Sequence, residues 1–332
     1  MPEKILTGDR PTGKLHLGHY VGSLQNRVAL QHTHDQYIMI ADVQALTDHF
    51  DRPGTITENI LEVAKDYLSV GIDPNQTTIL IQSNLPEIAE LTIYYLNLVS
   101  LGRLGRNPTV KTEIQQKEYK DSVSVGFFCY PINQAADITI FQAEWVPVGV
   151  DQLPMIEQTN EIVRRFNRLY QVDFLKECKA MLSHTSRLIG IDGKAKASKT
   201  LNNAIFLSDT PAAVKQKVFQ MYTDPNHIKV SDPGCVEGNV VFSYLDAFHL
   251  DKAEVESLKA HYRRGGLGDV TIKNILNHTL QLLLEPIRTQ RAALSDKMVQ
   301  EILQAGTQKA GLLAQKNMQT IREIMGIAKR WF

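Results

Sequence analysis

The stretch from Lys4 to Ser23 constrains the fold more than any other, because its residue pattern changes partway along. It opens with a short apolar run, Ile5-Leu6, and passes into a segment rich in turn-forming residues. Apolar residues then recur at helical spacing from Leu15 to Leu24. This succession predicts a strand, a turn and a helix, with His16 and His19 in the first turn of the helix.

The two histidines suggest what this helix start does. Unpaired N–H groups at a helix N-terminus attract phosphate. His16 and His19 stand three positions apart, so their rings face the same way and add donors there. Gly18 has no side chain, so we expect it to let a flat base approach closely. The pattern favours a grip on a nucleotide triphosphate; a glycine turn before a core helix, with solvated histidines, is the alternative.

Apolar runs and helical patterns alternate through the first half of the chain. Strands are predicted at Gln36–Ala41 and Thr77–Gln82, and helices at Thr57–Val70 and Glu87–Leu101. Such βαβ units predict an α/β fold with a doubly wound parallel sheet, which binds nucleotides at the carboxyl ends of its strands. The polar segment 102–124 is expected to be a surface excursion.

The second half reads as mainly α-helical. Residues 1–207 are expected to form a catalytic α/β domain and residues 208–315 a helical domain, with a last helix at about 316–332 packing back on the first domain. A helix is predicted to start at Asp209-Thr210-Pro211. Further helices are predicted at 253–262, 271–285, 296–315 and 318–332.

Composition limits the partners and the compartment. Lys plus Arg and Asp plus Glu number 36 each, so any RNA contact must come from local patches. The three cysteines form no C-x-x-C pair, which argues for a reducing cytoplasm and against disulfides or structural zinc. We expect no signal peptide, membrane span or DNA partner, and no metal at His32 and His34.

A lysine-rich segment, Gly193–Ala204, follows the predicted sheet. Lys194, Lys196 and Lys199 are expected to sit in a flexible stretch that closes over a polyphosphate. A solvated basic linker is the alternative. H-x-G-H followed by Lys196–Thr200, K-A-S-K-T, resembles the class I aminoacyl-tRNA synthetases, whose second signature is K-M-S-K-S.

The segment from Phe127 to Asn167 carries a third pattern. Tyr130, Gln134 and Asp137 are spaced to line one helix face. A buried carboxylate needs a partner, either a substrate N–H or O–H group or a basic neighbour. The sequence Y-P-x-x-x-A-A-D followed by V-P-V-G-x-D-Q closely resembles tryptophanyl-tRNA synthetases, and the similarity extends over essentially the whole chain.

This resemblance implies a Rossmann-like catalytic domain, a helical anticodon-binding domain and roles for the matching residues. The implied catalytic residues are His16, His19, Lys196 and Lys199. The implied ATP-binding residues are Arg10, Pro11, Thr12, Gly18, His19, Lys111, Gly149, Val150, Asp151, Leu188, Lys196, Ala197, Ser198, Lys199 and Thr200. The implied substrate-binding residues are Leu6, Tyr130, Gln134, Asp137 and Gln152, with Asp137 accepting the indole N–H.

The resemblance also implies a reaction. L-tryptophan and Mg-ATP would give tryptophanyl-AMP and pyrophosphate, and tryptophan would then pass to tRNA(Trp). It implies ATP with Mg²⁺ as a substrate complex, no tightly bound prosthetic group, and a homodimer. Arg263, Arg264, Arg288 and Arg291 are candidate phosphate contacts.

Three alternatives stay open at this point. Tyrosyl-tRNA synthetase shares both signatures, but its pattern has a bulky Tyr where this chain has Ala136. It also has G-G-S-D-Q where this chain has Pro147–Gln152, P-V-G-V-D-Q. Small nucleotidylyltransferases use H-x-G-H but lack the lysine segment and the helical half. A non-catalytic tRNA-binding paralogue would fit the altered lysine signature, with Ala197 and Thr200 in place of Met and Ser.

Overall fold

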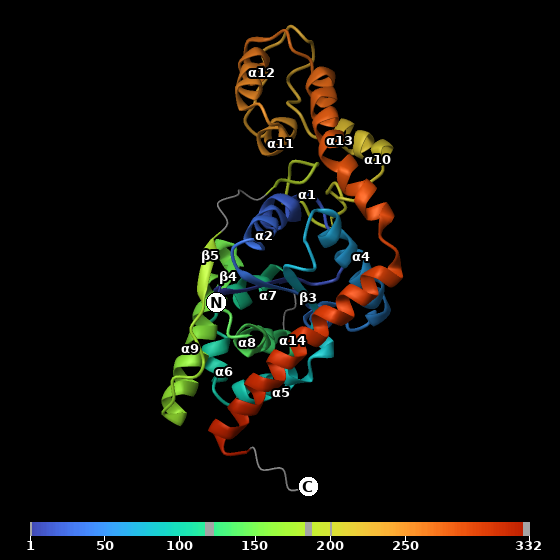
Figure 1. Cartoon of the computed structure of the whole chain (residues 1–332). Helices are drawn as coiled ribbons and strands as arrows, with labels where there is room; N and C mark the ends of the chain where they lie inside the picture. The colour runs from blue at the N-terminus through green and yellow to red at the C-terminus, as the bar shows by residue number, and fades with distance from the viewer. Residues whose placement is uncertain (1, 117–122, 183–187, 200, 328–332) are drawn as a thin grey trace.

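The computed structural model describes residues 2–116, 123–182, 188–199 and 201–327. A five-stranded, fully parallel sheet lies at its centre, with the strand order β3-β2-β1-β4-β5 (Figure 1). The predicted α/β class and parallel sheet are confirmed. The strands are β1 (Lys4–Asp9), β2 (Asp35–Ile40), β3 (Thr77–Ile81), β4 (Trp145–Val148) and β5 (Lys179–Leu182).

Alternate residues of β2 face two separate apolar layers, as a doubly wound sheet requires. Ile38 and Ile40 belong to a core cluster that also contains helix residues of the chain's second half. Tyr37 and Met39 belong to a second cluster on the opposite face. Sequence reasoning missed β4 and β5, because each has only four residues and Pro147 interrupts the apolar run of β4.

Helices cover both faces of the sheet (Figure 1). Up to β5 they are α1 (Leu17–His19), the π-helical turn η1 (Tyr20–Leu24), α2 (Gln25–Leu30), α3 (Asp42–His49), α4 (Pro53–Ser69), η2 (Gln82–Asn84), α5 (Pro86–Leu96), α6 (Leu101–Leu104), α7 (Pro108–Gln116), α8 (Val125–Ile140), η3 (Val150–Gln152) and α9 (Leu153–Tyr170). The strand, turn and helix predicted for Lys4–Ser23 are confirmed.

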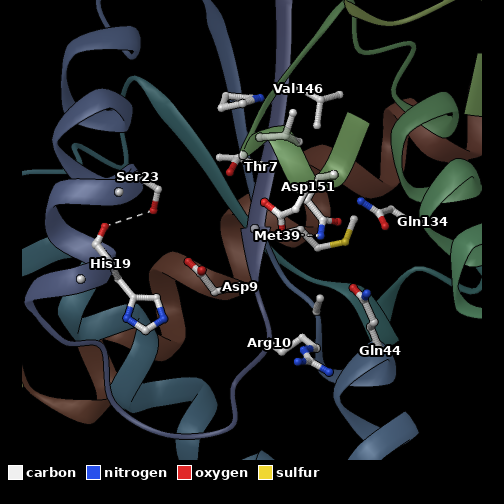
Figure 2. Close-up of a pocket in the computed structure, with 18 of the residues that line it drawn as sticks. Thr7, Asp9, Arg10, His19, Ser23, Met39, Gln44, Gln134, Val146 and Asp151 are labelled. Carbon is white, nitrogen blue, oxygen red and sulfur yellow. Dashed lines mark hydrogen bonds between the residues drawn. The ribbon is translucent and has the colours of Figure 1, made fainter. Parts of the chain in front are cut away.

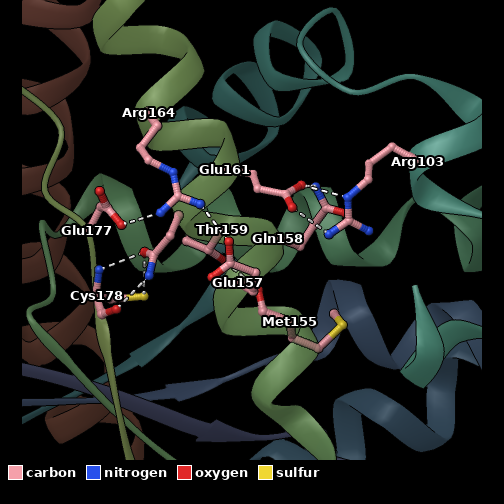
Figure 3. A network of polar contacts seen from close by, with 10 residues as sticks. Arg103, Met155, Glu157, Gln158, Thr159, Glu161, Arg164, Glu177 and Cys178 are labelled. Atoms are coloured by element: carbon pink, nitrogen blue, oxygen red, sulfur yellow. Dashed lines mark hydrogen bonds and ion pairs between the residues drawn. The ribbon is translucent and has the colours of Figure 1, made fainter. Parts of the chain in front are cut away.

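The segment 102–124 is more ordered than the sequence suggested. It contains most of α6 and all of α7, which bury Leu104 and Val110. Arg103 donates two hydrogen bonds to Glu161 on α9, of 2.7 and 2.8 Å, and so ties α6 to α9 (Figure 3). Residues 117–122 of this segment lie outside the described residues.

Four helices form an outer unit at the top of Figure 1. They are α10 (Pro211–Phe219), α11 (Val240–Phe248), α12 (Lys252–Arg264) and α13 (Asp269–Ala293). The helices predicted near 211, 253–262 and 271–285 are confirmed, and α11 was missed. Helix α13 continues through Pro286, where the prediction ended it. Leu282, one turn before the proline, is exposed, so the carbonyl that Pro286 leaves unpaired can meet water.

The last helix, α14 (Asp296–Met325), is one continuous element, so helical structure is confirmed for 296–315 and 318–325, and the predicted break between the two helices is wrong. The predicted helix end at 328–332 lies outside the described residues. Polar residues interrupt its apolar stripe, but Asn317 is buried and donates a 2.7 Å hydrogen bond to the Ile140 carbonyl. Thr307 accepts the N–H of Ile81, the last residue of β3. The stretch 296–315 therefore packs on the sheet and not in the outer helical unit.

Within the described ranges, no helix combines the length and the apolar character that crossing a bilayer requires.

Close packing between α14 and β3 makes a prediction about Gly306. A Cβ added there would lie 2.0 Å from the Ile79 carbonyl oxygen, a backbone atom that cannot move aside. We expect Gly306→Ala to lower the free energy of unfolding by about 2 to 3 kcal/mol in urea denaturation. The control is Gly311→Ala in the same helix, where the new methyl group meets nothing within 4 Å.

Alanine is the better helix former, so the control should stabilise the protein by up to about 1 kcal/mol. Equal effects of the two substitutions would contradict the close contact between α14 and β3.

Candidate functional site

A cavity of about 940 Å³ opens at the carboxyl ends of β1 and β4. These two strands are neighbours in the sheet, and the connections from them lead to opposite edges. A crevice of this kind is where parallel α/β sheets bind ligands. Figure 2 shows Thr7, Asp9 and Arg10 along the end of β1, with His19 on one side and Gln134 and Asp151 on the other.

Most residues that the sequence analysis assigned to a site line this one cavity. They are Leu6, Arg10, Thr12, His16, Gly18, His19, Gln134, Asp137, Gly149, Val150, Asp151, Gln152, Leu188, Lys196, Ala197, Ser198 and Lys199. Pro11, Lys111 and Tyr130 do not line it, and Thr200 lies outside the described residues. The structure thus brings together segments that are far apart in the chain, while the individual roles stay predictions.

The two histidines cap the helix that begins at Leu17. The Nδ1 atom of His16 accepts the Gly18 N–H at 3.1 Å, and the Nδ1 atom of His19 accepts the His16 N–H at 3.3 Å. A neutral imidazole has one acceptor nitrogen and one donor nitrogen. Because both Nδ1 atoms accept, each Nε2 atom carries the proton and is available as a donor.

Both rings are neutral at physiological pH. Burial lowers the pKa of His16 to about 3, helped by the neighbouring His19 and Lys199. Burial also lowers the pKa of His19 to about 4, although Asp9 opposes the shift. The ring centroids are only 3.9 Å apart, a spacing that two imidazolium cations would resist. The site therefore offers two neutral N–H donors.

Gly18 is needed for a different reason from the one expected. A Cβ at this position would lie 2.8 Å from the His16 ring. The glycine therefore makes room for the capping ring of His16, whereas the sequence analysis assigned the space to a bound base. The same added Cβ would lie 3.6 Å from the Cβ of Ala197, so the lysine segment packs directly against the histidine motif.

Lys199 reaches back across the chain to the turn after β1. Its ammonium group donates a 2.5 Å hydrogen bond to the Gly13 carbonyl. Burial lowers the pKa of Lys199, against the opposing fields of Asp9 and Asp66. One cation of the lysine segment is therefore held beside the helix start that carries the histidines, while Lys196 is exposed at the cavity edge.

The lysine segment is folded around the side chain of Asn203. The Asn203 carbonyl oxygen accepts the Ser198 N–H at 2.8 Å, and its amide donates to Asp192 and to the Lys196 carbonyl. The segment also pairs with Leu188, which precedes it, because the Ala197 N–H donates to the Leu188 carbonyl. The expected flexible stretch is thus a hairpin-like turn with an internal polar clamp.

The sequence analysis did not name Asp9 as a candidate site residue, although Asp9 lines the cavity at the end of β1. Its carboxylate accepts hydrogen bonds from Arg27 at 2.7 Å and from the Tyr67 hydroxyl at 2.8 Å. Burial opposes ionisation, but these partners hold the pKa of Asp9 well below its usual range. The only signal in the sequence was its place at the carboxyl end of the first strand.

Asp137 lies on α8, buried at the cavity wall. Both of its carboxylate oxygens accept from the Gln82 amide, at 2.8 and 3.0 Å. Among the described residues no cation pairs with Asp137, and the partner of its carboxylate is the neutral Gln82 amide. Burial raises the pKa of Asp137 to about 7, with Asp42 adding to the shift and Gln82 opposing it.

Three sequence expectations do not match the cavity. Tyr130 packs with Phe127, Val110 and Met155 instead of lining the site, although it shares α8 with Gln134 and Asp137. Lys111 is exposed on α7. Ala136, a candidate for shaping the substrate pocket, is buried in the core and does not line the cavity.

Three of the four arginines that the sequence analysis named as candidate phosphate contacts bind other groups of the protein. Arg291 is partly buried and pairs with Glu62 and Asp66, each at 2.6 Å. Arg263 pairs with Glu237, and Arg288 donates to Gln281. These three arginines therefore hold elements of the fold together. Arg264 is exposed in the last turn of α12.

Comparison with known proteins gives a consistent answer. A family model for class I tRNA synthetases (W and Y) matches residues 1–285. The tryptophan–tRNA ligase of Clostridium longisporum is 57% identical over 331 residues, which cover 98% of this chain and 97% of that protein. A tryptophan–tRNA ligase of Streptococcus pyogenes is 56% identical over 332 residues, covering 97% of this chain and 98% of that protein.

Solved structures agree with these relatives. The tryptophanyl-tRNA synthetase of Campylobacter jejuni, crystallised with ADP and tryptophan, superimposes with a TM-score of 0.86 at 30% identity. The alignment covers 97% of this chain and 99% of that one. On the fold, the cavity and these similarities, the chain belongs to the tryptophanyl-tRNA synthetases, within the class I family of tRNA synthetases for tryptophan and tyrosine.

Proposed function

We propose that this protein is a tryptophan–tRNA ligase. It activates L-tryptophan with Mg-ATP to tryptophanyl-AMP and pyrophosphate, and then transfers tryptophan to a ribose hydroxyl at the end of tRNA(Trp). The observation that carries the proposal is convergence: the histidine motif, the lysine segment and the buried Asp137 line one cavity at the switch point of the sheet.

The nucleotide half of the cavity supports phosphate chemistry. His16 and His19 present neutral N–H donors at the start of a helix, and Lys199 and Lys196 bring positive charge from the other side. In the proposed reaction, the tryptophan carboxylate attacks the α-phosphorus of ATP, and the bond to pyrophosphate breaks. Charge grows on the leaving phosphates, where these preorganised donors stabilise it. We propose that Mg²⁺ enters as part of the ATP complex.

The amino-acid half of the cavity supports an indole-bearing substrate. Its apolar walls come from Leu6, Met39, Val146 and Ile138, beside the carboxylate of Asp137. We propose that Asp137 accepts the indole N–H. We further propose that Gln152, at the opening of the cavity, holds the polar end of the amino acid.

Tyrosine is the neighbouring substrate in this family, and the relatives favour tryptophan. The curated proteins that match at 56 to 57% identity are tryptophan–tRNA ligases. The similarity includes both reactive segments, which speaks against a non-catalytic paralogue. Ala136 no longer contributes to this choice, because it lies in the core.

We also propose a homodimer that works in the cytoplasm. Large apolar side chains are exposed at the end of α5, the start of α6 and the start of α8, namely Ile93, Leu101 and Val125. Helices α5 and α6 both contact α8. We assign the anticodon-reading role to the outer helical unit, α10 to α13, and place its end near Ala293, because α14 packs on the sheet.

Amino-acid-dependent pyrophosphate exchange tests the proposed function directly. With ATP and each of tryptophan, tyrosine and phenylalanine, we expect exchange with tryptophan. Phenylalanine should exchange at least about 1000-fold more slowly, because a site built around a buried acceptor rejects ligands that lack a donor. Tyrosine carries an O–H donor on a smaller single ring, so we expect it to exchange more slowly than tryptophan. Preferential exchange with tyrosine would contradict the proposal and would assign the protein as a tyrosyl-tRNA synthetase. Retained tRNA binding without any exchange would favour the paralogue.

Lys199→Ala tests the proposed phosphate contact. Loss of one preorganised cation should lower the rate of tryptophanyl-AMP formation about 100-fold, measured by single-turnover kinetics. Tryptophan affinity, measured by equilibrium binding, should stay within about twofold, because the lysine stabilises departing phosphate and does not touch the amino acid. A collapse of tryptophan binding would contradict the role.

Asn203→Ala tests whether the clamped shape of the lysine segment matters. The substitution removes the acceptor of the Ser198 N–H and the donor to Lys196. We expect exchange to fall about tenfold, because the lysines lose their preset position. The neighbouring Asn202→Gly is the control: Asn202 is exposed and has φ = 50°, which glycine adopts without strain, so its activity should match the wild type.

A further inference from the structure

We propose that Gln82 is a positioning residue for tryptophan selection: its amide holds the Asp137 carboxylate so that a free acceptor faces the indole N–H. The inference rests on the proposed function, because it takes tryptophan as the substrate. Gln82 itself does not line the cavity. It sits behind the wall, at the first position after β3, and is 2% exposed.

The orientation of the Gln82 amide is determined by its surroundings. Its carbonyl oxygen accepts the backbone N–H of Gln44 at 3.1 Å. A flipped amide would set its NH₂ group against that N–H donor and its oxygen against the Asp137 carboxylate. Both contacts would be repulsive. The donor end of Gln82 therefore has to face Asp137.

Both donor hydrogens of Gln82 find acceptors on α8. One partner is the Asp137 carboxylate, and the other is the Asn133 side-chain oxygen, at 3.1 Å. Asn133 precedes Asp137 by one helical turn and is itself held, because it donates to Thr92 on α5 at 3.0 Å. The amide thus joins the end of β3 to two successive turns of α8 and limits the movement of the carboxylate.

A neutral amide suits this position better than a cation. An arginine or lysine beside Asp137 would form an ion pair and take up the carboxylate oxygens that a substrate needs. A carboxylate accepts about four hydrogen bonds, and the amide supplies a donor from one side only. Among the described residues, no other side chain or backbone group donates to Asp137. Acceptor capacity therefore remains for a neutral N–H group from the cavity.

The charge state of Asp137 depends on the same contact. The hydrogen bonds from Gln82 favour the ionised form, while burial and the nearby Asp42 on α3 oppose it. Asp42 is itself engaged at the backbone N–H groups of Val43 and Ser83. Without the Gln82 amide, the pKa of Asp137 would rise above its present value of about 7, and the acid would be mostly protonated at neutral pH.

The test is Gln82→Met, which keeps the side-chain length and removes the amide. In pyrophosphate exchange at pH 7.5, we expect kcat/KM for tryptophan to fall roughly 10- to 100-fold, mainly through KM. The KM for ATP should change less than about threefold. Because the ionised acid accepts the N–H, tryptophan binding should weaken as pH falls, and the midpoint of this dependence should move to higher pH in the variant.

A tryptophan analogue with sulfur in place of the indole N–H separates positioning from general damage. It offers no donor to Asp137, so its inhibition constant should change less than about threefold in Gln82→Met. In an Asp137→Ala background, Gln82→Met should add little further loss, because the two residues act through one contact. Equal weakening of tryptophan and the analogue, or an unmoved pH midpoint, would overturn the inference.

Gln36→Met is the matched control. Gln36 is also a fully buried glutamine that donates two hydrogen bonds, to the Arg27 carbonyl and to Thr77, but it does not line the cavity. The Gln36→Met substitution should lower the free energy of unfolding. It should not change the ratio of the tryptophan affinity to the analogue affinity. A change in that ratio equal to the one in Gln82→Met would also overturn the inference.

If Gln82→Met fails to fold, Gln82→Glu carries the same test. A second acid beside Asp137 opposes ionisation of the pair, so the pH midpoint must again move upward. An unmoved midpoint contradicts the inference. If the wild-type protein does not exchange with tryptophan, the proposed function is refuted. This measurement precedes those on the variants, so the two failures can be told apart.

Discussion

The site depends on the central place of β1 in a parallel sheet. Its backbone pairs with β2 along its whole length, from Lys4 with Asp35 to Asp9 with Ile40. On the other side it meets β4 through a single registered pair, Ile5 with Trp145. The carboxyl ends of β1 and β4 therefore separate, and the connections diverge from them. The cavity opens at this point.

Electrostatics then divide the cavity into two chemically different halves. Near the helix start, neutral histidines and a half-buried lysine surround the turn after β1, and Asp9 is neutralised by Arg27 behind it. This half favours a polyanion. At the other end, a lone carboxylate lies among apolar walls with only a neutral amide behind it. Burial of an unpaired acid is costly, and the hydrogen bonds of Gln82 reduce that cost.

The long helix α14 shows how the chain completes this arrangement. It crosses from the outer helical unit back over β3, where Gly306 and Thr307 touch the strand (Figure 1). The strand end that it covers leads directly into Gln82. Support for Gln82 therefore comes from the last part of the sequence as well as from the sheet itself.

Local patterns in the sequence were enough to determine the alternating class, the first three strands, the strand–turn–helix of the histidine motif and the lysine segment as a candidate part of the site. Periodicity and turn residues act over a few positions, so they can be seen without a structure. The tertiary structure alone decided what depends on contacts between distant segments: the short strands β4 and β5, the unbroken α14, the inward turn of Asp137 with Tyr130 directed elsewhere, and the Gln82 amide behind the acid. A side chain's partner across the sheet leaves no periodic trace in the sequence, because burial and hydrogen bonding are set only when the layers pack.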